Sequence, residues 1–163
     1  MTVRIRPATA DDAPAIAAIW NPVIRDTAIT FNPATKSEAE VAALIAERQA
    51  AHGFLVAVAD DGIAGFATYA QFRGGAGYLH TAEHSVILGP TARGQGIGRA
   101  LMTALCDHAR DRDMHSLIAA CSSENPGAIS FHEALGFARV AHLPQVGRKF
   151  DRWIDLILLQ KML

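Results

Sequence analysis

The chain has 163 residues, half of them hydrophobic, and a formal net charge of -1. This length predicts a single domain over residues 1–163 with a substantial core. The near-neutral charge argues against nucleic acid or an anionic membrane surface as a partner. No apolar run reaches the roughly 20 residues that span a bilayer, and the first residues lack the apolar region of a signal peptide. We therefore expect a cytoplasmic protein.

The first half of the chain predicts two helices and a strand hairpin. The segment Thr9–Asp12 predicts a helix start, because threonine caps helices well and acidic residues favour the first turn. Ser37–Glu40 has the capping-box pattern of a second helix. Phe54–Ala59 and Ile63–Phe72 are strand-like runs, and Asp61-Gly62 between them is a hairpin turn signal.

The second half predicts strands that alternate with helices. The expected strands are Glu83–Leu88, Leu117–Cys121, Ala138–Leu143 and Trp153–Leu159, and the expected helices are Ile97–Ala109 and Pro126–Leu135, the latter ended by Gly136. This order predicts an α/β (α+β) fold with helices packed around one sheet.

A glycine-rich segment between a strand and a helix carries the chemical signal. Residues 93–99 read Arg-Gly-Gln-Gly-Ile-Gly-Arg. Glycines let successive backbone amides turn toward one point, and the free amides and dipole of a helix N-terminus attract phosphate. The spacing matches neither the Rossmann fingerprint nor a P-loop. The segment therefore predicts a pyrophosphate site, with an ordinary glycine-rich turn as the alternative.

Arg93-x-x-Gly96-x-Gly98 after a strand resembles the acetyl-CoA-binding motif of the GCN5-related N-acetyltransferase (GNAT) superfamily. Residues Asn125–Phe137 resemble its second signature. Tyr78–Val86 and Val146–Asp155 are similar to the phosphinothricin and methionine sulfone or sulfoximine acetyltransferases. The resemblance implies a mixed, mostly antiparallel sheet of about seven strands flanked by about four helices. It also implies acetyl-CoA as cosubstrate, a small amine as acceptor and a homodimer.

The resemblance places two catalytic candidates. Glu83 is the candidate general base for the incoming ammonium, or an anchor for it; the alternative is a solvated strand-edge acid. His132 is the candidate general acid for the departing thiolate, at a position where many relatives carry tyrosine. The alternatives are a hydrogen bond to the CoA sulfur and a histidine packed on a helix. The Val86 amide is expected to polarise the thioester carbonyl.

The remaining site residues divide between the two substrates. For acetyl-CoA they are Val86, Ile87 and Leu88 along the pantetheine arm, and Arg93, Gly94, Gln95, Gly96, Ile97, Gly98, Arg99, Asn125 and Ser130 around the phosphates and arm. For the acceptor they are Phe31, Phe72, Tyr78 and Trp153 as pocket walls, Glu83, and Arg73 as the partner of a substrate carboxylate. The subfamily commonly carries further arginines where this chain has Gly75 and Leu79.

Other polar residues give weaker signals. His80 and His84 fall on one strand face without a clear third ligand, so we expect no metal site. Cys106 and Cys121 lie in apolar stretches and are interpreted as core thiols, which argues against an acetyl-cysteine intermediate. Two other functions remain open: an acetyltransferase of the same fold that acts on protein termini or lysines, and a non-catalytic acyl-CoA-binding module.

Overall fold

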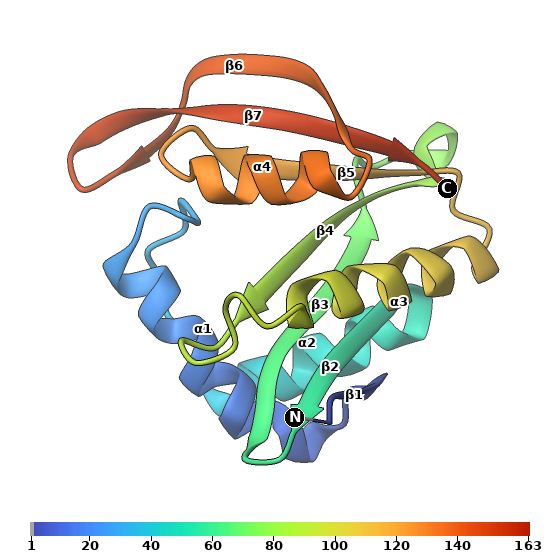
Figure 1. Cartoon of the computed structure of the whole chain (residues 1–163). Helices are drawn as coiled ribbons and strands as arrows, with labels where there is room; N and C mark the ends of the chain where they lie inside the picture. The colour runs from blue at the N-terminus through green and yellow to red at the C-terminus, as the bar shows by residue number, and fades with distance from the viewer. Residues whose placement is uncertain (1) are drawn as a thin grey trace.

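One sheet of seven strands, in the order β1-β2-β3-β4-β5-β7-β6, forms the centre of the computed structural model, which describes residues 2–163 (Figure 1). The strands are β1 (Arg4–Pro7), β2 (Gly53–Ala59), β3 (Gly62–Gln71), β4 (Thr81–Leu88), β5 (Ser116–Ser122), β6 (Ala138–Lys149) and β7 (Arg152–Met162). The helices are α1 (Ala13–Asp26), α2 (Glu38–Ala51), α3 (Ile97–Asp111) and α4 (Pro126–Ala134), with short 3₁₀ turns at Ala10–Asp12 and Ala76–Tyr78. Seven strands and four helices confirm the predicted fold.

The helix starts follow their local sequence. At α2 the Ser37 hydroxyl accepts a hydrogen bond from the Glu40 amide, and the Glu40 carboxylate accepts one from the Ser37 amide, so the predicted capping box is confirmed. Near α1 the Thr9 amide donates to the Asp12 carboxylate, which also pairs with Arg6. The first turn there is a 3₁₀ turn, and α1 itself begins at Ala13.

The sequence pattern does not predict β1, and the structure corrects this. Residues Arg4–Pro7 pair antiparallel with Leu55–Val58 at the edge of the sheet. The strand has four residues and two arginines, so it is too short to show a clear apolar alternation. Ile5 nevertheless packs against the core.

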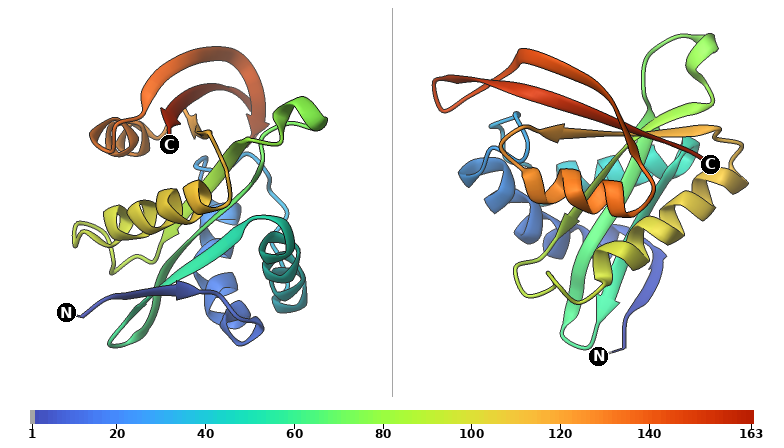
Figure 2. Two further views of the ribbon diagram at one scale, coloured as in Figure 1. Left: turned by 90° about the vertical axis from the view of Figure 1, so that its right-hand side faces the viewer. Right: turned by 45° about the horizontal axis from the view of Figure 1, so that its top comes forward.

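The helices cover the sheet in two pairs. Alternate residues of β2 face opposite ways, since Phe54 and Val56 pack with α1 and α2 whereas Leu55 and Ala57 pack with α3. Figure 2 (left) shows α2 and α3 on opposite sides of these strands. The helix α4 contributes Ile129 to the same core cluster as α3. One face of the sheet therefore carries α1 and α2, and the other carries α3 and α4.

The same alternation along β4 separates its side chains. Ile87 packs with the α1–α2 cluster, whereas Ala82, Val86 and Leu88 pack with the α3–α4 cluster. Odd-numbered side chains of this strand therefore face α1 and α2, and even-numbered ones face α3 and α4.

The sheet opens between β4 and β5. The strands β4 and β5 run parallel to each other. Their pairing covers only Thr81–His84 of β4 against Ser116–Ala119 of β5. Beyond it β4 remains paired with β3 through Leu88, and β5 remains paired with β7 through Ser122. The two strands therefore diverge and leave an unpaired backbone edge on each side of the gap.

Cys106 and Cys121 are both free and buried, which confirms them as core thiols. Within residues 2–163, no helix has both the length and the apolar character needed to cross a membrane.

Candidate active site

A cavity of about 770 Å³ occupies the gap between β4 and β5. Its wall includes residues of α1 and the following loop on one face of the sheet, and of α4 and the loop before α3 on the other. It brings together twelve of the predicted site residues: Phe31, Glu83, Val86, Ile87, Leu88, Arg93, Gly94, Gly96, Gly98, Arg99, Asn125 and His132.

The other predicted site residues lie outside the cavity wall: Phe72, Arg73, Tyr78, Gln95, Ile97, Ser130 and Trp153. Ile97 is the first residue of α3, and its side chain is buried in the core. The Arg73 guanidinium lies over the Tyr78 ring, 5.5 Å from its centroid, on an exposed segment. Trp153 is 58% exposed and lies beside Arg148 at the β6–β7 turn.

The unpaired edge of β4 is formed by Val86 and Leu88. The Phe72 amide donates to Thr81, and the Gly89 amide donates to Ala64, so the backbone groups of odd-numbered residues along β4 point toward β3. Backbone groups alternate along a strand, and those of Val86 and Leu88 therefore point into the gap. Ile87 contributes its side chain to the cavity wall while its carbonyl faces β3.

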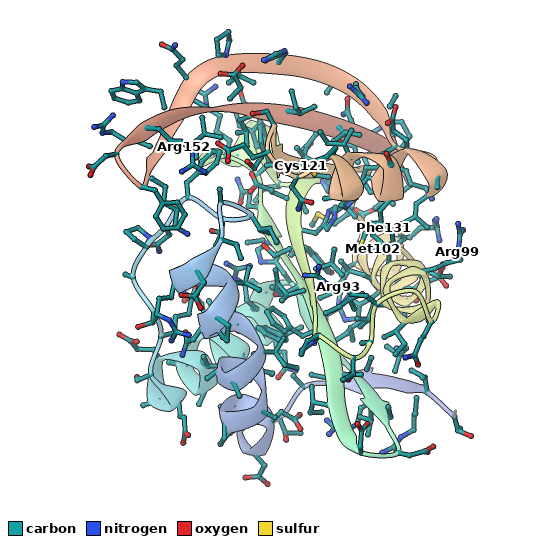
Figure 3. All side chains as sticks on the ribbon, turned by 60° about the vertical axis from the view of Figure 1, so that its left-hand side comes forward. Arg93, Arg99, Met102, Cys121, Phe131 and Arg152 are labelled. Carbon is teal, nitrogen blue, oxygen red and sulfur yellow. The ribbon has the colours of Figure 1, made fainter. Side chains whose placement is uncertain are left out.

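The glycine segment before α3 leaves its amides free. Gly94 and Gly96 have φ angles of +75° and +78°, a region that favours glycine, and Gly96 is the N-cap of α3. No side chain caps this helix start, so its amides remain available to an anion. Arg93 lies on the adjoining loop (Figure 3). The arrangement fits a pyrophosphate.

Gly98 has a different role from the other two glycines. A Cβ at this position would lie 3.2 Å from the Phe131 ring and 3.3 Å from a Leu88 methyl. Phe131 of α4 lies close to α3 in Figure 3. Glycine here therefore allows α3 and α4 to approach each other beside the cavity.

Glu83 lies on the α1–α2 face of the cavity. Its side chain is accessible from the cavity, but the protein around it removes enough water to raise the pKa of the carboxyl above its ordinary value. Arg48 of α2 opposes this shift. A carboxylate with a raised pKa is a stronger base, which suits proton removal from an ammonium group.

His84 and His132 form a buried pair on the opposite face. Their Nε2 atoms are 2.8 Å apart, and His132 Nδ1 lies 2.7 Å from the Ala128 carbonyl oxygen. A carbonyl only accepts, so His132 Nδ1 must carry a proton. In the neutral ring Nε2 is then an acceptor, and His84 Nε2 donates to it. His84 Nδ1 has no hydrogen-bond partner among the described residues.

The Acetyltransferase (GNAT) family model matches residues 20–137. The chain belongs to this family. It is 38% identical over 160 residues to the L-amino acid N-acyltransferase MnaT of Escherichia coli K12, covering 98% of this chain and 93% of that protein. It is 37% identical over 163 residues to the L-methionine sulfoximine/L-methionine sulfone acetyltransferase of Pseudomonas aeruginosa, with 98% and 94% coverage.

A solved GNAT structure has the same fold as this chain. The chain superimposes with a TM-score of 0.94 and 31% identity on a phosphinothricin acetyltransferase from Sinorhizobium meliloti in complex with acetyl-CoA, covering 100% of this chain and 89% of that one. The predicted family and fold are confirmed. The protein is a GNAT acetyltransferase, and acetyl-CoA is its acetyl donor.

Sequence patterns did not identify His84 as part of this GNAT site. Its spacing to His80 raised only the question of a metal, whereas the structure shows His80 exposed and His84 buried against His132. The two paired histidines are separated by 48 residues, so no local pattern links them. Cys121, interpreted as a core thiol, also contributes to the cavity wall, 3.8 Å from His132 Nδ1.

The histidine pair predicts a stability loss in acid. Burial, with a smaller effect of the His132 ring, lowers the pKa of His84 from 6.5 to about 3. Below about pH 6.5 the unfolded chain binds a proton that folded His84 does not, so the free energy of unfolding falls with decreasing pH by up to about 1.4 kcal/mol per unit. Urea unfolding between about pH 4 and pH 6.5 measures this slope. His84→Gln should reduce it, and the exposed-site control His115→Gln should not. Equal slopes in all three proteins would contradict the assignment.

Proposed function

We propose that this GNAT enzyme acetylates the amino group of a small amino-acid-like acceptor of the phosphinothricin, methionine sulfone or methionine sulfoximine type. One observation carries the proposal: the cavity passes through the sheet between β4 and β5. The free amides of the glycine segment lie at its α3–α4 side, and Glu83 lies at its α1–α2 side. Two substrates can therefore meet from opposite faces. The names of the relatives supply the acceptor class.

We assign the acetyl-CoA side as follows. The amides at Gly94–Gly98 face the pyrophosphate, and Arg93 and Arg99 neutralise phosphate charge. The free edge of β4 at Val86 and Leu88 pairs with the pantetheine arm, as a strand edge pairs with a peptide. Asn125 also lines the cavity, although its side-chain oxygen already accepts from the Ala128 amide and caps α4.

The proposed chemistry is direct transfer in a ternary complex. The Glu83 carboxylate takes a proton from the acceptor ammonium, directly or through one water, and frees the nitrogen lone pair. The amine then attacks the thioester carbonyl, and the Val86 amide stabilises the negative oxygen. The tetrahedral species collapses, the C–S bond breaks and CoA leaves as the thiolate. The second proton of the amine nitrogen passes to water or to this thiolate, which gives the neutral amide. Burial raises the pKa of the Cys121 thiol to about 11, so a cysteine nucleophile is not part of this route.

His132 is assigned to the side of the departing sulfur. Its neutral ring has no N–H left to give, because Nδ1 donates to Ala128 and Nε2 accepts from His84. It can therefore act as an acid only after the histidine pair takes up a proton, which burial disfavours. Since a thiol has an ordinary pKa of about 8.5, its thiolate needs less help in leaving than an alkoxide does. We therefore assign a larger share of catalysis to Glu83 than to His132.

Among the described residues, no arginine or lysine lines the cavity on the acceptor side. Among the described residues that line the cavity, the arginines are Arg93 and Arg99, next to the glycine segment. Arg73 lies on an exposed loop outside it. We propose a cytoplasmic, single-domain protein that forms a homodimer, in which Arg73 of the second copy completes the acceptor site.

Thiol release from acetyl-CoA tests the proposed function. The panel contains methionine sulfone, methionine sulfoximine, phosphinothricin, ordinary amino acids and a peptide. We expect release with one or more of the first three, and mass spectrometry should find the acetyl group on their amine. Release with the peptide alone would replace the proposal by a peptide acetyltransferase. Silence across the panel, with CoA bound, would indicate an acyl-CoA-binding module instead.

A further inference from the structure

The wall of the cavity on the acceptor face is built largely from an irregular segment. Ile29, Thr30 and Phe31, which follow α1, line the cavity together with Trp20 and Val23 of the helix itself. This is the face onto which Glu83 projects. Residues 27–31 include no regular strand or helix, so their position depends on contacts from elsewhere in the fold.

Lys149 at the end of β6 supplies those contacts. Its side chain is buried, with 5% exposure for the residue. The Nζ atom donates to the carbonyl oxygens of Ile24 at 2.5 Å, Thr27 at 2.6 Å and Thr30 at 2.7 Å. A lysine ammonium has three N–H groups, so all are used. The carbonyls lie at the end of α1, where the helix dipole favours a cation, and in the following segment.

The residue two positions earlier in β6 also contacts this segment. Gly147 lies so close to the Phe31 ring that a Cβ at this position would overlap the ring. The end of β6 therefore contacts residues 27–31 in two ways. Lys149 holds their backbone, and Gly147 packs against the Phe31 ring, which lines the cavity. In Figure 1 the turn of the β6–β7 hairpin lies above the end of α1.

We propose that Lys149 is a positioning residue for the acceptor site. By joining the Thr27 and Thr30 carbonyls to the Ile24 carbonyl at the end of α1, it sets the shape of the pocket that receives the amine and so determines which acceptors fit. The inference rests on the proposed function, because it assigns this wall to the acceptor. It also gives the end of β6 a part in substrate selection, although residues 147–149 do not line the cavity.

Lys149→Met tests this role by removing the three donors while keeping an apolar stem of similar length. We expect the KM for the acceptor to rise by about ten-fold or more, since hydrogen bonds to a charged group are lost, while the KM for acetyl-CoA changes by less than about two-fold. Lys161→Met is the matched control. Lys161 Nζ donates to the Leu135 carbonyl at the end of α4 and lines no part of the cavity, so both KM values should stay unchanged.

The split between the two KM values separates positioning from general stabilisation. An unchanged acceptor KM in folded Lys149→Met, or an equal rise in both KM values, would overturn the inference. If that variant does not fold, Lys149→Arg is judged by the same criterion, since it keeps the cation but alters the donor geometry. The acceptor used is whichever amine the wild-type enzyme acetylates. A failure of the proposed substrate class therefore appears in the wild-type panel, and a failure of the Lys149 assignment appears in the variant.

Discussion

Replacing Glu83 by glutamine is expected to lower kcat by about 10²–10⁴-fold, the usual contribution of a positioned general base. The amide keeps the shape of the side chain but does not take the proton of the ammonium group. The KM for acetyl-CoA should stay close to that of the wild type, because Glu83 lies on the α1–α2 face and the glycine segment serves the other face. Steady-state kinetics with both substrates varied measure the two effects.

The pH profile gives a sharper test of the same residue. A base must be deprotonated to act, so wild-type kcat/KM should fall on the acidic side with a midpoint above the ordinary pKa of a glutamate, since burial raises the pKa of Glu83. Glu83→Gln should lose this acidic limb. Glu47→Gln, at an exposed position of α2, serves as the control and should retain it. A variant at position 83 with wild-type turnover across pH would remove Glu83 from the mechanism.

Gly96→Val is expected to raise the KM for acetyl-CoA by about 10–100-fold, the loss of one or two hydrogen bonds to a charged group. Gly96 has a φ of +78° at the start of α3, a conformation that a β-branched residue does not adopt without strain. The amides of residues 94–98 would then no longer converge on one point. Isothermal titration with CoA should show the same loss in the absence of turnover.

A second glycine separates loss of binding from loss of stability. Gly62, at the start of β3 directly after the β2–β3 turn, also has a positive φ, +119°, and lines no part of the cavity. Gly62→Val should lower the free energy of unfolding through similar backbone strain while leaving the affinity for CoA unchanged. Equal losses of affinity in the two variants would show that the glycine segment has no specific role in binding.

Local patterns predicted most of the fold because its signals act over a few residues. The Ser37 capping box, the Asp61-Gly62 turn and the apolar repeat after Gly96 each specify one element, and each element lies where it is predicted. The helix start after the glycine segment was predicted for the same reason, since its signal lies in consecutive residues. β1 was not predicted, because its register depends on the neighbouring strand β2.

The parts of the site that depend on distant contacts were not predicted. Lys149 and the carbonyl of Thr30 are separated by 119 residues, and His84 and His132 by 48. No periodicity or motif connects such pairs, since only the folded sheet brings them together. Arg73 shows the reverse case: residue type and resemblance suggested a place in the pocket, but a single chain holds it outside.

The short ladder between β4 and β5 divides the enzyme into two halves. Strands β1–β4 with α1, α2 and α3 form one half, and β5–β7 with α4 form the other; the parallel pairing that joins them runs only from Thr81–His84 against Ser116–Ala119. The core cluster around α3, the His84–His132 bond and the Lys149 contacts cross this boundary, and acetyl-CoA in the site proposed for it contacts both halves. Because a ligand stabilises the state that binds it, acetyl-CoA has a structural effect besides its part in the chemistry: the free energy of unfolding rises with its concentration.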